Sequence, residues 1–119
     1  MRKTSQKEEY KVLNELSNVT IDRLKAENGK NLTLIQIKND TQKTIENFVF
    51  KKYSMMSMKN ANSILNDENA TEFDAAEVLF NDGLVYGRFD AVDDVDVFPQ
   101  LVRELKALRD EVEVNVKKL

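Results

Sequence analysis

The sequence predicts a mostly helical α+β fold, with an N-terminal helix, one antiparallel β-hairpin, two short helices and a long C-terminal amphipathic helix. Three observations predict it. Apolar residues in the segment 96–119 recur at alternating steps of four and three, the spacing of one apolar stripe on a helix. Between residues 31 and 52, two short runs rich in Leu, Ile and Phe have the length and composition of strands. One Pro and three Gly in 119 residues predict few sharp breaks.

Residues 1–29 are predicted to form an N-terminal helix or arm, and residues 30–119 a single α+β domain. Ser5 can cap the first helix, because Glu8 follows three residues later as in a capping box. A glycine at position 29 ends this helix. Residues 18–20, Asn-Val-Thr, are poor helix formers, so a break near them is compatible with the pattern.

The hairpin is predicted at residues 31–52, with a turn at 39–42. Ile35 and Ile37 share one face of the first strand, and Phe48 and Phe50 share one face of the second. A lone hairpin is marginally stable in water, so its apolar face needs a helix or a strand from another copy.

Helices are predicted near residues 5–28, 54–66, 71–82 and 97–117, with Ser54 and Thr71 as N-caps. The apolar positions of these helices and of the hairpin give the expected core. Its members are Ile35, Ile37, Phe48, Phe50, Leu65, Val78, Leu79, Leu101, Leu105 and Leu108.

Composition argues against several classes of function. The chain has no His and no Cys, so imidazole and thiolate chemistry and the usual zinc sites are excluded. No glycine-rich phosphate loop is present, and without His or Cys the usual nucleophile with its base cannot be assembled. Ser-Lys chemistry stays formally open, but Ser54, Ser57 and Ser63 lie on or beside a predicted helix with no special turn, so we predict a non-enzyme without a cofactor or metal. The net charge of −3 and dispersed basic residues argue against nucleic-acid binding. The sequence has no apolar run long enough to span a membrane, so we expect a cytoplasmic protein.

The acidic loop at residues 87–96 contains the one carboxylate cluster to weigh as a site. Its spacing does not match a calcium loop, which needs a central Gly and a distal Glu. Capping is the favoured interpretation, with Asp96 or Asp94 at the start of the last helix and Pro99 in its first turn. A weak metal site is the alternative. The acidic residues concerned are Asp90, Asp93, Asp94 and Asp96.

Two apolar surfaces are candidate partner-binding sites. Met55 and Met58 share a side of the helix at 54–66, and Met adapts to varied partners, although it also fills cores. At the chain's end, Val112, Val116 and Leu119 extend the apolar stripe, in which Asn115 is a polar exception. Valines at alternate positions make this end apolar on more than one side of a helix. It is therefore expected to project from the domain and meet another chain, or a second copy.

One resemblance covers roughly residues 32–119. The run NFVFKK leads into a helix, and FDAAEVLFNDGLVYG leads through the acidic loop to a helix ending in VKKL. This pattern resembles small tail-module proteins of tailed phages and prophages, whose family role is tail assembly chaperone. The resemblance implies binding to a tape-measure or tail-tube protein in the host cytoplasm. A structural virion subunit and a small acidic regulator of a host protein are the alternatives.

Overall fold

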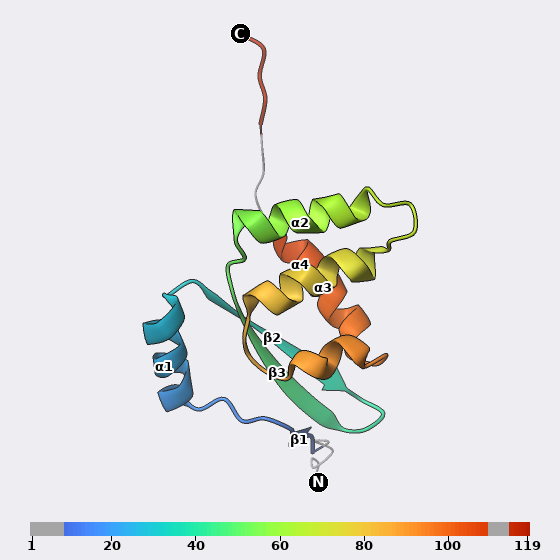
Figure 1. Cartoon of the computed structure of the whole chain (residues 1–119). Coiled ribbons are helices and arrows are strands. Elements are labelled where there is room, and N and C mark those ends of the chain that lie inside the picture. The colour runs from blue at the N-terminus through green and yellow to red at the C-terminus, as the bar shows by residue number, and fades with distance from the viewer. Residues whose placement is uncertain (1–8, 110–114) are drawn as a thin grey trace.

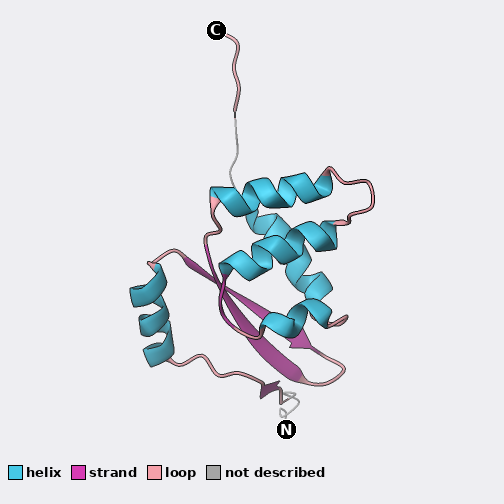
Figure 2. Cartoon of the chain, in the orientation of Figure 1, coloured by secondary structure: helices cyan, strands magenta, loops and turns pink. Residues whose placement is uncertain are grey.

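The computed structural model of the protein describes residues 9–109 and 115–119, and combines an open β-sheet with α-helices (Figures 1 and 2). Helices α2, α3 and α4 gather on one side of the sheet, and α1 lies apart from them beside β4. The elements in chain order are β1 (Lys11–Val12), α1 (Asn18–Asn28), β2 (Leu32–Asn39), β3 (Thr44–Lys51), α2 (Met55–Leu65), α3 (Glu72–Gly83), β4 (Leu84–Tyr86), a 3-10 helix (Phe89–Asp93) and α4 (Phe98–Arg109).

Strand β3 is the centre of the sheet. Along one edge it pairs with β2 in antiparallel register, so that Ile35 lies opposite Phe48. Its other edge is shared by β1, which is parallel to its start, and β4, which is antiparallel to its later half. The prediction of a mostly helical fold with a single hairpin was therefore wrong, because the hairpin belongs to a four-stranded mixed sheet and the α-helices take fewer than half of the described residues, whereas the α+β class is confirmed. Strands of two and three residues are too short to show an alternating pattern.

The main core lies between the sheet and the helices and is centred on Phe80. The Phe80 ring centroid lies 5.7 Å from those of Phe50 and Phe98, and both ring pairs meet edge to face. Seven of the residues predicted for the core are buried, namely Ile35, Ile37, Phe48, Phe50, Leu79, Leu101 and Leu105. Leu65 was predicted wrongly, since it is 41% exposed at the end of α2. Val78 is half-buried, and the side chain of Leu108 lies outside the described part.

The first helix begins later than the predicted residue 5. Lys11–Val12 is a strand, and α1 starts at Asn18 after Ser17, whose Oγ accepts a hydrogen bond from the Thr20 N–H at 3.2 Å. The weak helix formers at 18–20 are thus the first turn of the helix. The predicted cap Ser5 lies outside the described residues. Gly29, with φ of 88°, ends the helix as expected.

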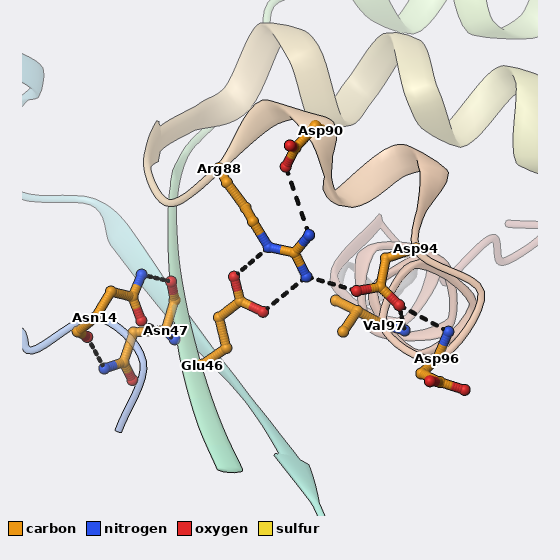
Figure 3. A network of polar contacts seen from close by, with 8 residues as sticks. All are labelled: Asn14, Glu46, Asn47, Arg88, Asp90, Asp94, Asp96 and Val97. Carbon is orange, nitrogen blue, oxygen red and sulfur yellow. Dashed lines mark hydrogen bonds and ion pairs between the residues drawn. The ribbon is translucent and has the colours of Figure 1, made fainter. Parts of the chain in front are cut away.

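Asn14 extends the parallel pairing of β1 through its side chain. The Lys11 and Leu13 N–H groups donate to the carbonyls of Lys43 and Ile45, both at 2.9 Å. Beyond them, the Asn14 amide bonds both backbone groups of Asn47, accepting from its N–H and donating to its carbonyl at 2.8 Å (Figure 3). Asn47 Nδ2 in turn donates to the Asn14 carbonyl at 2.8 Å. The Asn14 side chain therefore supplies hydrogen-bond partners for the backbone of β3 at Asn47, between the β3 residues that pair with β1 and those that pair with β4.

Replacing Asn14 by Ala should therefore destabilise the fold. The change leaves the N–H and carbonyl of Asn47 without their Asn14 partners, and Asn47 is 3% exposed. Loss of such buried partners costs about 1–3 kcal/mol. The free energy of unfolding, measured by urea titration, checks this value. Asn31→Ala, at an exposed position, is the control and should be close to neutral.

The C-terminal helix is shorter than the predicted 97–117. Helix α4 is described from Phe98 to Arg109, and residues 115–119 have no regular structure. Asn115 and Val116 have low helix propensity, which accounts for the absence of helix there. In these last residues, the side chains of Val116 and Leu119 are fully open to solvent. Within the described residues, no helix has the length and apolar character needed to cross a membrane.

Candidate functional site

A groove lies between the outer edge of β2 and helix α4, and we call it the β2–α4 groove. It encloses about 860 Å³. Residues 33–40 form one wall, and one side of α4 and its preceding turn form the other. The residues contributed by the helical wall are Asp96, Gln100, Arg103, Glu104 and Ala107.

The outer edge of β2 is an unused hydrogen-bonding edge, since none of the described strands pairs with it. Asn47 directs its N–H and carbonyl toward Asn14, away from β2. The backbone N–H and C=O groups of successive residues in a strand point to opposite edges. Those of Glu46 and Phe48 therefore point toward β2, where they face Ile37 and Ile35. The backbone groups of the intervening β2 residues must then point outward. These residues are Leu34, Gln36 and Lys38.

The two faces of β2 differ sharply in burial. Ile35 and Ile37 are buried beneath the helices, whereas Leu34 is 47% exposed and Gln36 and Lys38 are exposed. A strand added at this edge would thus extend the face of Ile35 and Ile37 on the helix side and the exposed face of Leu34, Gln36 and Lys38 on the other. Charged side chains of both signs are among the residues that line the groove, namely Lys38, Asp96, Arg103 and Glu104. Such an edge favours an extended segment that alternates between apolar and polar residues.

The start of α4 is fixed to the sheet by a charged cluster of Glu46, Arg88 and Asp94, drawn in Figure 3. Arg88 binds Glu46 through two parallel hydrogen bonds, from Nε to Oε2 at 2.6 Å and from Nη2 to Oε1 at 3.0 Å. The same Nη2 donates to Asp94 Oδ2 at 2.6 Å. Glu46 is 5% exposed, so Arg88 supplies the partner that its buried carboxylate needs.

The hydrogen bonds within the cluster shift the pKa values of Arg88 and Asp94. Hydrogen bonds to Glu46 and then Asp94 hold the pKa of Arg88 above its ordinary value. The hydrogen bond from Arg88, together with those from backbone N–H groups, lowers the pKa of Asp94. Arg88 and Asp94 therefore both stay charged at neutral pH, and the cluster is a structural clamp.

Gly87 places Arg88 over the sheet. Its φ of 123° belongs to the region that favours glycine. A Cβ atom there would also lie 2.7 Å from Cδ1 of Phe48. Position 87 therefore needs glycine if the chain is to leave β4 close to the Phe48 ring and present Arg88 to Glu46.

The acidic loop has the capping role predicted for it. Asp94 Oδ1 accepts hydrogen bonds from the N–H groups of Asp96 at 2.9 Å and Val97 at 3.3 Å, just before α4. Of the two caps considered, the structure thus selects Asp94. Asp90 contacts Arg88 at 3.5 Å and is largely exposed. Across residues 9–109 and 115–119, no group of three or more acidic side chains is arranged to hold a metal ion.

The described members of the predicted partner-binding set lie outside the β2–α4 groove. Met55 is 70% exposed on α2, and Met58 is half-buried. Val116 and Leu119 are exposed in the final residues, and Val112 lies outside the described part. The structure does not bring these positions together into one described surface, so their role in binding stays a prediction.

Sequence reasoning missed the groove, the clamp and the Asn14–Asn47 pair. One signal was present for Glu46, which is two residues before Phe48 and therefore falls on the same, inward face of β3. A carboxylate at an inward position requires a cationic partner. Arg88 could have been proposed for that role, but only the fold shows that it reaches Glu46.

The comparisons with known proteins are negative: no protein-family model matches the chain, and neither a curated protein nor a solved structure matches it. The function must therefore be argued from the geometry. The two features that carry most information are the outward-facing backbone of β2 and the groove beside it.

Proposed function

We propose that this chain is a non-enzymatic protein–protein interaction protein that binds an extended polypeptide segment as an added strand on β2. One observation carries the proposal. The eight-residue strand β2 offers the backbone groups of Leu34, Gln36 and Lys38 beside a groove of about 860 Å³. Strand addition uses such an edge, with main-chain hydrogen bonds for affinity and alternate side-chain sites for specificity.

The edge has one of the usual protections against pairing, the charge of Lys38, and lacks most of the others. Proteins shield exposed edges with charged side chains, short strands, prolines, bulges or a covering element. β2 contains no Pro, and its register with β3 is continuous from Leu32 to Asn39. Helix α4 stands beside the edge and leaves the groove open. The strand is therefore suited to a partner rather than to exposure to water alone.

An assembly chaperone is the form of this function that we propose. Such a protein would hold an extended segment of a tape-measure or tail-tube protein along β2 in the bacterial cytoplasm until assembly. The exposed Met55 on α2 would add an adaptable apolar contact outside the groove. Two kinds of support lead to this proposal, the resemblance of residues 32–119 to phage tail-module proteins and the open edge itself.

Replacing Leu34 by Pro should abolish partner binding at this edge. The change removes one outward N–H, and the Pro ring obstructs an incoming strand. The inward hydrogen bonds of Ile35 and Ile37 are kept, so the sheet itself should persist. Peptides selected on the intact chain from a random displayed library are the probe. Their dissociation constants, measured by fluorescence polarisation, should rise about tenfold or more.

Leu34→Ala is the matched control, because it removes the side chain but keeps the N–H group. Its peptide affinities should stay close to those of the unchanged chain. Circular dichroism and urea titration of all three proteins establish that they are folded. Selected peptides that bind the Pro variant as well as the Ala variant would contradict strand addition and direct attention to α2.

A further inference from the structure

The C-terminal sequence has the pattern of a β-strand. Residues 111–117 read EVEVNVK, in which Val112, Val114 and Val116 alternate with polar residues. Period-two alternation of β-branched and polar side chains is typical of a strand with one buried face. In the structure, Val116 is 90% exposed, which leaves an apolar side chain uncovered. This segment has the alternation that the β2 edge favours.

We propose that the β2–α4 groove binds residues 111–117 of a second copy of the chain, as a strand antiparallel to β2. The proposal rests on the strand-addition function proposed above and names its partner. Each copy would give its C-terminal segment to the groove of the other. This reciprocal exchange fills both grooves and closes a two-fold dimer.

One antiparallel register satisfies both faces of the added strand. With Val116 opposite Ile35, Val114 falls opposite Ile37, and the valines extend the face of the sheet that carries these two buried isoleucines. On the other face, Asn115 falls opposite Gln36, and Glu113 falls opposite Lys38. An amide pair and an opposite-charge pair are both favourable directly across strands.

A parallel strand that keeps the amide pair is less favourable. With Asn115 beside Gln36 in parallel orientation, Lys117 comes beside Lys38. Like charges at neighbouring cross-strand positions are destabilising. In registers that keep the amide pair, the side chains thus favour the antiparallel direction.

The direction of α4 excludes the chain's own C-terminal segment. Asp96 and Val97, before α4, share a cavity with Ile37 and Asn39 near the end of β2. From there α4 runs back along β2 toward its start (Figure 1). A segment that follows Arg109 directly would enter its own groove parallel to β2. One residue, Asp110, separates Arg109 from the strand pattern and spans less than about 4 Å. The antiparallel strand must therefore come from another copy.

A charge exchange between two copies tests the proposal on the full-length chain. In a dimer of the Glu113→Lys variant, each introduced lysine lies opposite Lys38 of the other copy. In a dimer of the Lys38→Glu variant, each introduced glutamate lies opposite Glu113 of the other copy. In an equimolar mixture of the two variants, the introduced lysine meets the introduced glutamate in one half of the dimer. In the other half, the unchanged Glu113 meets the unchanged Lys38. Sedimentation equilibrium should show a dimer for the unchanged chain, about tenfold weaker dimerisation for each variant alone, and recovery in the mixture.

Two controls separate the interface from folding and from general charge effects. Val95→Glu adds a charge at a site that is 84% exposed and outside the groove, and dimerisation should not change. Amide hydrogen exchange at Leu34, Gln36 and Lys38 should be slow in the dimer and fast after Val116→Asp. Because Val116 is already exposed, that variant should fold normally.

Two results would overturn the inference. One is that the unchanged chain is monomeric at every concentration. The other is that the mixture of the two variants dimerises no better than each variant alone. Neither result bears on strand addition by other peptides, which the Leu34→Pro comparison tests separately. If Leu34→Pro leaves peptide binding intact, the proposed function fails whatever the oligomeric state.

Discussion

Replacing Arg88 by Met is expected to lower the free energy of unfolding by about 2–4 kcal/mol. The change keeps an unbranched apolar stem and removes the guanidinium that bonds Glu46, whose side chain is 7% exposed. Breaking a buried ion pair costs about 3–5 kcal/mol because the remaining charge is uncompensated, and the partial exposure of Arg88 reduces that cost. Chemical denaturation at neutral pH measures the effect.

The double variant Glu46→Leu with Arg88→Met separates the lost attraction from the buried charge. If the orphaned carboxylate dominates, the double variant should recover most of the stability lost by Arg88→Met. Asp90→Asn is the matched control, because Asp90 meets Arg88 at 3.5 Å with a side chain 76% exposed. It should change stability by less than about 1 kcal/mol. A double variant no more stable than Arg88→Met would show that Arg88 acts through another contact.

The clamp also makes stability depend on pH in acid. The pKa of Asp94 is lowered in the folded state, mainly by the hydrogen bond from Arg88. Its contribution to stability is therefore complete above the unfolded-state pKa of about 3.9 and is lost as the pH falls through the folded-state pKa. In the Arg88→Met variant this component of the acid transition should be smaller.

Replacing Phe80 by Ala should cost about 3–5 kcal/mol, which would be the largest effect of any single truncation considered for this chain. Phe80 is fully buried, and its ring lies within 6.3 Å of the Phe48, Phe89 and Phe98 ring centroids. Its removal leaves a cavity where α3, α4 and the sheet meet. Thermal and urea unfolding should both show the loss.

Phe73→Ala is the control for this truncation. Phe73 lies on the same helix, and its ring contacts Phe98 at 6.3 Å, but it is 47% exposed. Its loss should cost about 1 kcal/mol, since roughly half of its surface already faces water. Equal effects at positions 73 and 80 would contradict the placement of the core.

Local signals in the sequence predicted the starts of α2 and α3 well. Ser54 caps α2, its Oγ accepting from the Ser57 N–H at 3.1 Å. At Thr71, the backbone N–H donates to Asp74 at 2.9 Å, as expected for an acidic residue three positions after a cap. These contacts span three residues, so the information needed to predict them lies within one helical turn. Helices α2 and α3 accordingly start within a residue of the predicted positions.

Contacts between distant segments were not predictable from pattern alone. Asn14 and Asn47 are 33 positions apart, and Arg88 and Glu46 are 42 apart. Neither pair stands out locally, because Asn is common in loops and Arg88 adjoins a polar loop. The β2–α4 groove depends on which edge of β3 each strand takes, and that choice is made by the short strands β1 and β4.

The end of the chain shows how one pattern can fit two periods. The steps of four and three from Leu101 onward predict a helix, and α4 follows them to Arg109. Beyond it, valines at 112, 114 and 116 had been interpreted as a helix with too many apolar sides. The same three positions satisfy a period of two without any surplus.

The pairing of β1 also sets an order of events during synthesis. Lys11–Val12 is made more than thirty residues before its partner in the sheet, Thr44–Ile45. A further tie, from the Tyr86 hydroxyl to the Glu15 carbonyl, needs a residue made some seventy positions after Glu15. The β2–β3 pair, joined by a short turn, can close before either of these contacts. The segment that contains β1 and Glu15 is thus fixed only after later residues of the sheet have been made, and a nascent chain stalled before Tyr86 lacks the tie to Glu15.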